Sequence, residues 1–292
     1  MTKVAVMTDT NSGFTKADAE KAGVFLQPMP FMINGKSYHE GVDIDFPAFY
    51  AYLQNGADVS TSQPMPGEVI TLWDSILAQG YDEIVYIPMS SGLSNSCQTA
   101  LVLAQEYGNR VQVVDNHRIS VTLKQSVFDA LILGREGKSA LEIKQILEQE
   151  AYDASIFISV DTLEYLKKGG RVTAAGAAIG TVLNIKPVLT IQGDKLDAFA
   201  KVRGMKTARK TMIHVVKQDL QERFSQLYAA GKLGVYFAYT DLPQEVKQSW
   251  EQELQQAFPE VRVVGDPLAM SIGCHIGPGA LAVGICRTRI SN

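Results

Sequence analysis

Metal-binding and disulfide patterns are missing from this sequence. Its 292 residues include only four histidines and three cysteines, Cys97, Cys274 and Cys286. The cysteines are odd in number and far apart, and they form neither a C-x-x-C pair nor a Cys/His spacing that would hold zinc. This pattern is typical of buried free thiols, so we expect no bound metal and a reducing, cytoplasmic compartment.

An excess of positive charge and a long apolar run are also missing. The net charge of −4 and the pI of about 5.6 argue against nucleic acid as the main partner. No window approaches the roughly 20 apolar residues of a membrane span. The opening MTKVAVMTDT is typical of a strand rather than of a secretory signal. With 46% hydrophobic and 20% charged residues, the composition is that of a soluble globular protein.

Strands and helices alternate along the first half of the chain. The segments KVAVMTD, EIVYIPM and VQVVD are predicted as strands. Helices are expected over residues 15–23 and 46–56, near Pro66, from about Ser94, and after Ser139, which forms a capping box with Glu142. This alternation predicts an α/β domain with a doubly wound, mostly parallel sheet, and we place it at residues 1–152.

The pattern changes near residue 153. A strand at ASIFISVD precedes an expected hairpin over residues 186–204, with its turn at Gly193-Asp194. A long helix is expected from 205 to about 230, followed by the strands GVYFAYTD, VRVVGDP and ALAVGICR. Because strands and helices are mixed with a hairpin, residues 153–292 are predicted to form a second, α+β domain.

Hydroxyl side chains crowd three loops of the first half, at residues 8–13, 60–62 and 90–96. In a doubly wound sheet, ligands bind beyond the carboxyl ends of the strands, where such loops lie. Each loop could equally serve only to cap a helix. The third loop leads into a helix, so its hydroxyls and free backbone N–H groups would point to one place and could hold an anion.

A hydrolase is the alternative that these loops leave open. GLSNS nearly matches the nucleophile elbow G-x-S-x-G, although Ser96 stands where the last glycine is expected. Ser94 and His275, with an aspartate, could then form the triad of a serine esterase. The motifs G-x-x-x-x-G-K-[ST], G-x-G-x-x-G and H-E-x-x-H are all missing, so we expect no nucleotide site and no cofactor.

Seven short motifs, each weak by itself, are together specific for one protein family. TDTNSG, STSQP, SSGLSNS, YLKKGGRV, NIKPVLTI, KVRG and HIGPGALAVG occur in that order. In these motifs the chain resembles, from end to end, the DegV family. The better-understood members of that family are the fatty-acid-binding (FakB-type) subunits of bacterial fatty acid kinase. It departs from the family pattern at Asn95-Ser96, where Gly-Thr is usual, and at Thr10, where Ser is usual.

The resemblance implies a Rossmann-like and an α+β domain that bury a long-chain fatty acid between them. It also implies a non-catalytic role: a separate ATP-dependent kinase subunit phosphorylates the bound carboxylate, and the acyl phosphate feeds phospholipid synthesis. Transient membrane contact would allow lipid exchange. By position, the residues around the carboxyl group would be Thr61, Ser62, Ser94, Arg203 and His275.

The same residues suit a fatty acid physically. Burying about 14 to 18 carbons at ~0.8 kcal/mol per methylene gives a gross gain on the order of 10 kcal/mol. The polar groups then need only offset the desolvation of the carboxylate. His275 could donate a hydrogen bond or titrate near neutral pH, or be an ordinary core histidine. Arg203 could meet the carboxylate or the partner, or be a solvated strand-end charge.

Other positions are less specific. Lys167, Lys168 and Arg171 flank a double glycine, and cations there suit a helix C-terminus better than a partner contact. The small residues of 172–183 and the large apolar residues of 25–33 could line a tunnel for the acyl chain. Ordinary packing explains both segments as well.

Overall fold

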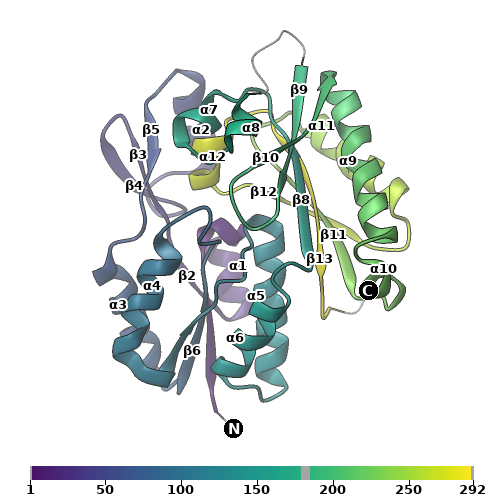
Figure 1. The fold of residues 1–292 in the computed structure, drawn as a ribbon. Helices are drawn as coiled ribbons and strands as arrows, with labels where there is room; N and C mark the ends of the chain where they lie inside the picture. The colour runs from purple at the N-terminus through teal and green to yellow at the C-terminus, as the bar shows by residue number, and fades with distance from the viewer. Residues whose placement is uncertain (1, 179–184, 291–292) are drawn as a thin grey trace.

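A parallel sheet forms the centre of the first half of the chain. The computed structural model describes residues 2–178 and 185–290 (Figure 1). The sheet has the order β2-β1-β6-β7, and its strands are β1 (Val4–Asp9), β2 (Val24–Gln27), β6 (Glu83–Ile87) and β7 (Val111–Val113). All three pairings are parallel. Strands with near-continuous apolar sequence are expected in such a sheet because both of its faces are buried.

Helices cover both faces of this sheet, as a doubly wound fold requires. Val6 and Val85 pack with α1 (Lys16–Ala22), α5 (Ser120–Arg135) and α6 (Ala140–Gln149). Met7 and Tyr86 point the other way, toward α3 (Pro66–Ala78) and α4 (Ser96–Ala104) (Figure 1). Thr15 caps α1, and the predicted Ser139–Glu142 capping box opens α6. The predicted α/β architecture is confirmed.

A mixed six-stranded sheet forms the centre of the second half. Its order is β10-β9-β8-β13-β11-β12, and the strands are β8 (Ala154–Ser159), β9 (Ile185–Ile191), β10 (Asp197–Arg203), β11 (Leu233–Tyr239), β12 (Val263–Pro267) and β13 (Leu281–Arg287). The predicted hairpin is β9–β10, which pairs antiparallel. On one face Phe157 and Val283 pack with α9 (Gly204–Gln221) and α11 (Gln244–Ala257).

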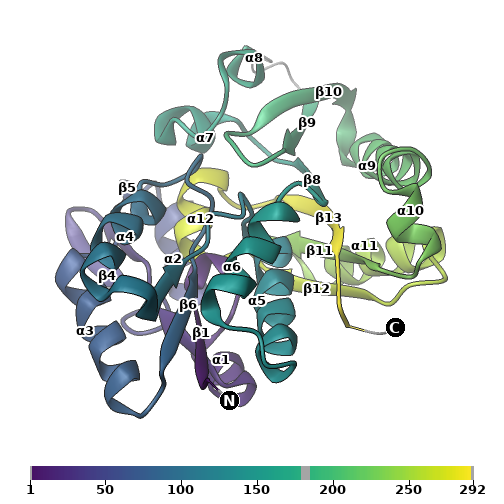
Figure 2. The ribbon, with the colours of Figure 1, turned by 60° about the horizontal axis from the view of Figure 1, so that its bottom comes forward.

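The opposite face of the six-stranded sheet turns toward the first half. Ile156 and Ala282 share one buried cluster with Val127 of α5 and Val85 of β6. Both halves therefore contribute to a continuous core, and Figure 2 shows α5 lying against β13 and β11. All strands of the parallel sheet precede residue 114 and all strands of the mixed sheet follow residue 153. The domain boundary at 152/153 stays a prediction.

A third, small sheet was not anticipated from the sequence. Its order is β4-β3-β5, with β3 (Pro30–Ile33), β4 (Lys36–His39) and β5 (Val59–Thr61), and α2 (Phe46–Gln54) lies between β4 and β5 in sequence. Phe31 and Phe49 of this unit pack with Met270 and Cys274 of α12 (Met270–Ile276). Figures 1 and 2 both show α12 beside α2 and β5, although α12 lies near the end of the chain.

Two helix predictions differ from the structure in detail. The helix expected over 205–230 is divided into α9 and α10 (Ser225–Ala229), because the backbone leaves the helical region at Glu222, where ψ is −80°. The helix expected from Ser94 begins two residues later, at Ser96. The remaining elements are η1 (Thr10–Ser12), η2 (Gln105–Arg110), α7 (Glu164–Gly169) and α8 (Ala174–Ala177). Among the described residues, no helix has the length and apolarity needed to cross a membrane.

Candidate functional site

A cavity of about 220 Å³ lies where the two halves meet. It is bounded by the loops that follow β1, β5 and β6, by α12, and by one face of the six-stranded sheet. Its apolar lining includes Met29, Leu93, Ile156, Ile158, Ile191, Leu196, Ala238, Leu268 and Ala282. Its polar lining is Asn11, Thr61, Ser62, Gln63, Ser94, Asn95, Ser120, Arg171, Ser271 and His275.

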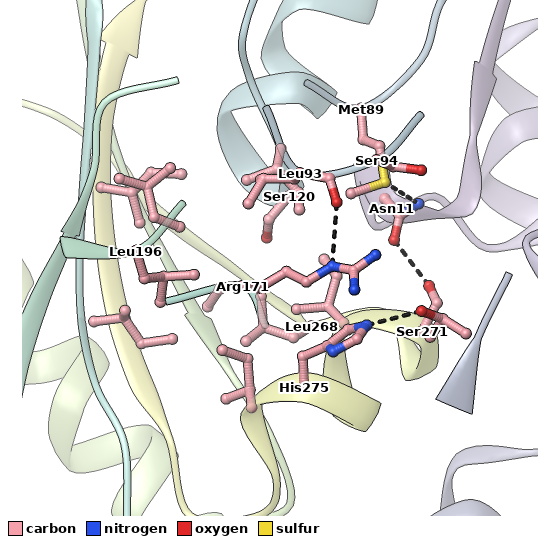
Figure 3. Close-up of a pocket in the computed structure, with 18 of the residues that line it drawn as sticks. Asn11, Met89, Leu93, Ser94, Ser120, Arg171, Leu196, Leu268, Ser271 and His275 are labelled. Carbon is pink, nitrogen blue, oxygen red and sulfur yellow. Dashed lines mark hydrogen bonds between the residues drawn. The ribbon is translucent and has the colours of Figure 1, made fainter. Parts of the chain in front are cut away.

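The polar side chains gather at one side of the cavity. Figure 3 shows Asn11, Ser94, Ser271 and His275 there, with Leu196 opposite. The hydroxyl-rich loops after β1, β5 and β6 each bring at least one polar residue to this wall. A cavity of this kind, polar at one end and apolar elsewhere, suits an elongated apolar molecule with one polar group.

Thr61 and His275 form a direct contact between the two halves at the polar end. Thr61 Oγ1 lies 2.8 Å from His275 Nε2. His275 Nδ1 has no hydrogen-bond partner among the described residues. The ring is packed so closely on Gly169 that a Cβ at that position would collide with Nδ1. Glycine at 169 is thus what allows the imidazole to reach the cavity wall.

His275 is neutral at pH 7 in this environment. Burial lowers its pKa to about 4, and the positive charge of Arg171 adds to the effect. The suggestion that His275 titrates near neutral pH therefore does not hold for the ring in these surroundings. A carboxylate placed beside the ring would favour the imidazolium and raise the pKa again.

Arg171 is the cation at the cavity wall. Its Nε donates to Leu93 O at 3.3 Å and its Nη1 donates to Gly169 O at 2.6 Å. Among the described residues, no carboxylate lies within 4.0 Å of its guanidinium. A half-buried arginine held by carbonyl groups and lacking an acidic partner is ready to pair with an incoming anion.

The three hydroxyl loops divide their side chains between structure and cavity. Ser12 Oγ donates to Asp9 O, and Ser90 Oγ donates to Gly193 O in the turn of the β9–β10 hairpin. Ser94 lines the cavity, and its Oγ accepts from Ser96 N at 3.2 Å, which satisfies the start of α4. The imidazole Nε2 of His275 is hydrogen-bonded to Thr61 Oγ1 and not to Ser94.

The five residues expected at the site separate into two groups. Thr61, Ser62, Ser94 and His275 all line the cavity. Arg203 does not: it is exposed, ends β10 and precedes α9. Its role stays a prediction. The apolar segment 25–33 contributes Met29, and residues 179–184 of the small-residue segment lie outside the described residues.

Sequence reasoning missed Arg171, Asn11 and Ser271 as cavity residues. Arg171 follows the end of α7, where a cation has a sufficient local explanation. Ser271 lies in α12, whose seven residues carry no periodic pattern that would have indicated a helix. Asn11 lies in the loop 8–13, which the sequence indicates as a candidate ligand loop because of its hydroxyl groups. The polar amide of Asn11 in that same loop is the feature that could have indicated it as a cavity residue.

Comparison with known proteins gives a family match over almost the whole chain. A model of the uncharacterised DegV protein family matches residues 3–288. A DegV domain-containing protein of Deinococcus radiodurans is 31% identical over 284 residues, which cover 97% of this chain and 98% of that protein. One from Caldanaerobacter subterraneus is 30% identical over 287 residues, covering 97% and 98% respectively.

Solved structures show the same fold. A DegV family protein of Thermus thermophilus, described as fatty-acid-binding, superposes with a TM-score of 0.86 at 29% identity over 98% of this chain and 99% of that one. A fatty-acid-binding DegV family protein of Streptococcus agalactiae gives a TM-score of 0.85 at 26% identity over 99% and 100% respectively.

Proposed function

This chain belongs to the DegV family, and we propose that it binds a long-chain fatty acid in the cavity between its halves. The carboxylate would lie at the polar end, near Thr61, Ser94, Arg171 and His275, and the acyl chain would lie along Ile156, Leu196 and the other apolar residues. The observation that carries the proposal is a mostly apolar cavity whose one cation has no acidic partner among the described residues.

The energetics favour this kind of ligand. Burial of the acyl chain supplies most of the binding free energy, at ~0.8 kcal/mol per methylene. The carboxylate loses its hydration on entry, and Arg171 together with the hydroxyl of Thr61 replaces it with charged and neutral hydrogen bonds. The Thermus thermophilus and Streptococcus agalactiae proteins support the same ligand class.

Phosphorylation of the bound fatty acid is the second part of the proposal. The chain has no motif for holding ATP phosphates, so a separate ATP-dependent kinase subunit would transfer the γ-phosphoryl group to a carboxylate oxygen, giving acyl phosphate and ADP. The acyl phosphate would then enter phospholipid synthesis. In this scheme Arg203, which lies outside the cavity, would act on the transferred phosphate or on the partner.

Extraction of the purified protein tests the ligand directly. Protein expressed in bacteria is extracted with organic solvent, and the extract is analysed by mass spectrometry. A long-chain fatty acid close to one per chain is expected. Ala282→Phe, which fills the apolar part of the cavity, should reduce this occupancy while the fold is kept. No fatty acid in the extract, together with no saturable binding of added fatty acid, would contradict the proposal.

A further inference from the structure

A buried carboxyl group stands directly behind the polar end of the cavity. Glu40, only 6% exposed, follows β4 and reaches the start of α12. It accepts hydrogen bonds from the backbone N–H of Met270 and from Ser271 N at 3.4 Å. The hydroxyls of Thr10 and Ser271 each lie 2.9 Å from Glu40 Oε2. Glu40 therefore holds α12, which carries Ser271 and His275, against the loop after β1.

When Glu40 is ionised, two oxygen–oxygen contacts between Glu40 and the cavity wall share a single donor hydrogen, that of the Ser271 hydroxyl. Ser271 Oγ lies 2.9 Å from Glu40 Oε2 and 2.8 Å from Asn11 Oδ1. The amide of Asn11 is oriented by its Nδ2, which donates to Met89 Sδ at 3.0 Å, so its oxygen faces Ser271. A single hydroxyl hydrogen cannot serve two acceptors.

A proton on Glu40 completes this chain. The protonated carboxyl donates to Ser271 Oγ, and the hydroxyl of Ser271 then donates to Asn11 Oδ1. Both contacts become hydrogen bonds, and buried polar groups are normally satisfied in this way.

The surroundings of Glu40 offer no positive charge to hold it ionised. Among the described residues, no Lys or Arg side chain lies within 4.0 Å of its carboxyl group. The titratable groups on the elements packed around it are Asp9, Tyr50, Cys274 and His275, with His39 and Asp43 beside it in the chain. Burial raises the pKa of Glu40 to about 7, against the lowering effect of its hydrogen bonds.

We propose that Glu40 takes up a proton from solvent when a carboxylate ligand enters the cavity, and that it is the positioning residue of the carboxylate site. The inference rests on the proposed fatty acid function. Asn11 and Ser271 line the cavity and lie between it and Glu40. The carboxylate of the ligand therefore brings a negative charge close to that of Glu40, and like charges disfavour ionisation. Uptake of the proton removes the repulsion and fixes Ser271 and α12 in one hydrogen-bonded arrangement.

The pH dependence of binding tests the inference. The Kd of cis-parinaric acid, a fluorescent C18 fatty acid, is measured from pH 6 to 9 for the wild type, for Glu40→Gln, and for Glu20→Gln on the exposed face of α1 as a control. The ratio of wild-type Kd to Glu40→Gln Kd cancels the ionisation of the probe itself. That ratio should rise above pH 7 by up to about tenfold per pH unit, and Glu20→Gln should follow the wild type.

Infrared difference spectra give a second readout that does not need the variant. Palmitate labelled with ¹³C at its carboxyl carbon is added at pH 8, so that its own band is displaced from those of the protein. A new side-chain carboxylic-acid C=O band is expected in the wild type and should be lost in Glu40→Gln. Saturable binding without this band, a band that persists in Glu40→Gln, or parallel pH profiles would overturn the inference. Absence of saturable binding at every pH would instead overturn the proposed function.

Discussion

Thr61 and His275 are 214 residues apart in sequence, and their side chains meet at 2.8 Å. Thr61 ends β5 of the small sheet, and His275 lies in α12, the last helix of the second half. The contact therefore exists only when the two halves of the chain are packed together. The polar end of the cavity is a product of both halves, and its geometry depends on how they are joined.

Loss of the His275 ring should weaken fatty acid binding. His275→Ala removes the side chain that holds Thr61, whose hydroxyl we propose donates to the carboxylate. Hydrogen bonds to charged groups contribute about 1.5–3 kcal/mol, so Kd should rise by about tenfold to a hundredfold in fluorescence titration. His214→Ala, an exposed histidine of α9, is the matched control and should bind normally. Equal affinity of both variants would exclude His275 from the site.

The two arginines should have separable effects. Arg171→Gln removes the cation at the cavity wall and should raise the Kd for fatty acid by about tenfold or more. Arg203→Gln, outside the cavity, should leave Kd within about twofold. When a fatty acid kinase subunit and ATP are added, acyl-phosphate formation should fall in both variants, in Arg203→Gln as in Arg171→Gln. A large loss of binding in Arg203→Gln would instead place that guanidinium at the ligand.

The stability of the protein should fall as the pH rises from about 4.5 to about 7, because of Glu40. Its pKa in the folded state, about 7, lies above its ordinary value of 4.5. The folded state then binds more protons between these two pH values, so stability is full below pH 4.5 and is lost as pH rises through 7. Glu40→Gln should match the wild type at pH 5 and exceed its free energy of unfolding at pH 8.5 by about 1–3 kcal/mol. Urea unfolding at both pH values measures this, and equal stability at pH 8.5 would contradict it.

The turn of the β9–β10 hairpin should control ligand exchange. A Cβ at Gly92 would lie 2.7 Å from Gly193 O and would collide with Asp194, and the neighbouring Ile191 and Leu196 line the cavity. Gly92→Ala should therefore push the hairpin outward and speed fatty acid release severalfold, at a cost in stability of about 1–3 kcal/mol. Stopped-flow displacement measures the rate. Gly67→Ala, where a Cβ would meet nothing within 4 Å, should leave the release rate unchanged.

The general architecture could be predicted because its signals are local. The apolar runs of β1 and β6, the helix caps at Thr15 and Ser139 and the turn at Gly193 each depend on residues close together in the sequence. The small sheet was missed for the same reason. Its strands β3 and β4 have four residues each, and β5 has three, which is too short for alternation to distinguish a strand from a loop.

By itself, the sequence determined the α/β and α+β architectures, the family, and four of the residues that line the cavity. Ser94 was indicated because it follows β6 of the parallel sheet, at the edge where ligands bind. Thr61, Ser62 and His275 were indicated by the family motifs, since β5 is antiparallel and His275 lies in a helix.

Only the tertiary structure decided that Arg171 lines the cavity and Arg203 does not, and that Glu40 lies behind Ser271. Arg171 reaches the cavity wall beside Leu93, 78 residues away in the sequence, and Glu40 contacts Ser271, 231 residues away. The burial of these side chains and their hydrogen-bond partners depend on how the two halves pack. No local sequence pattern indicates them.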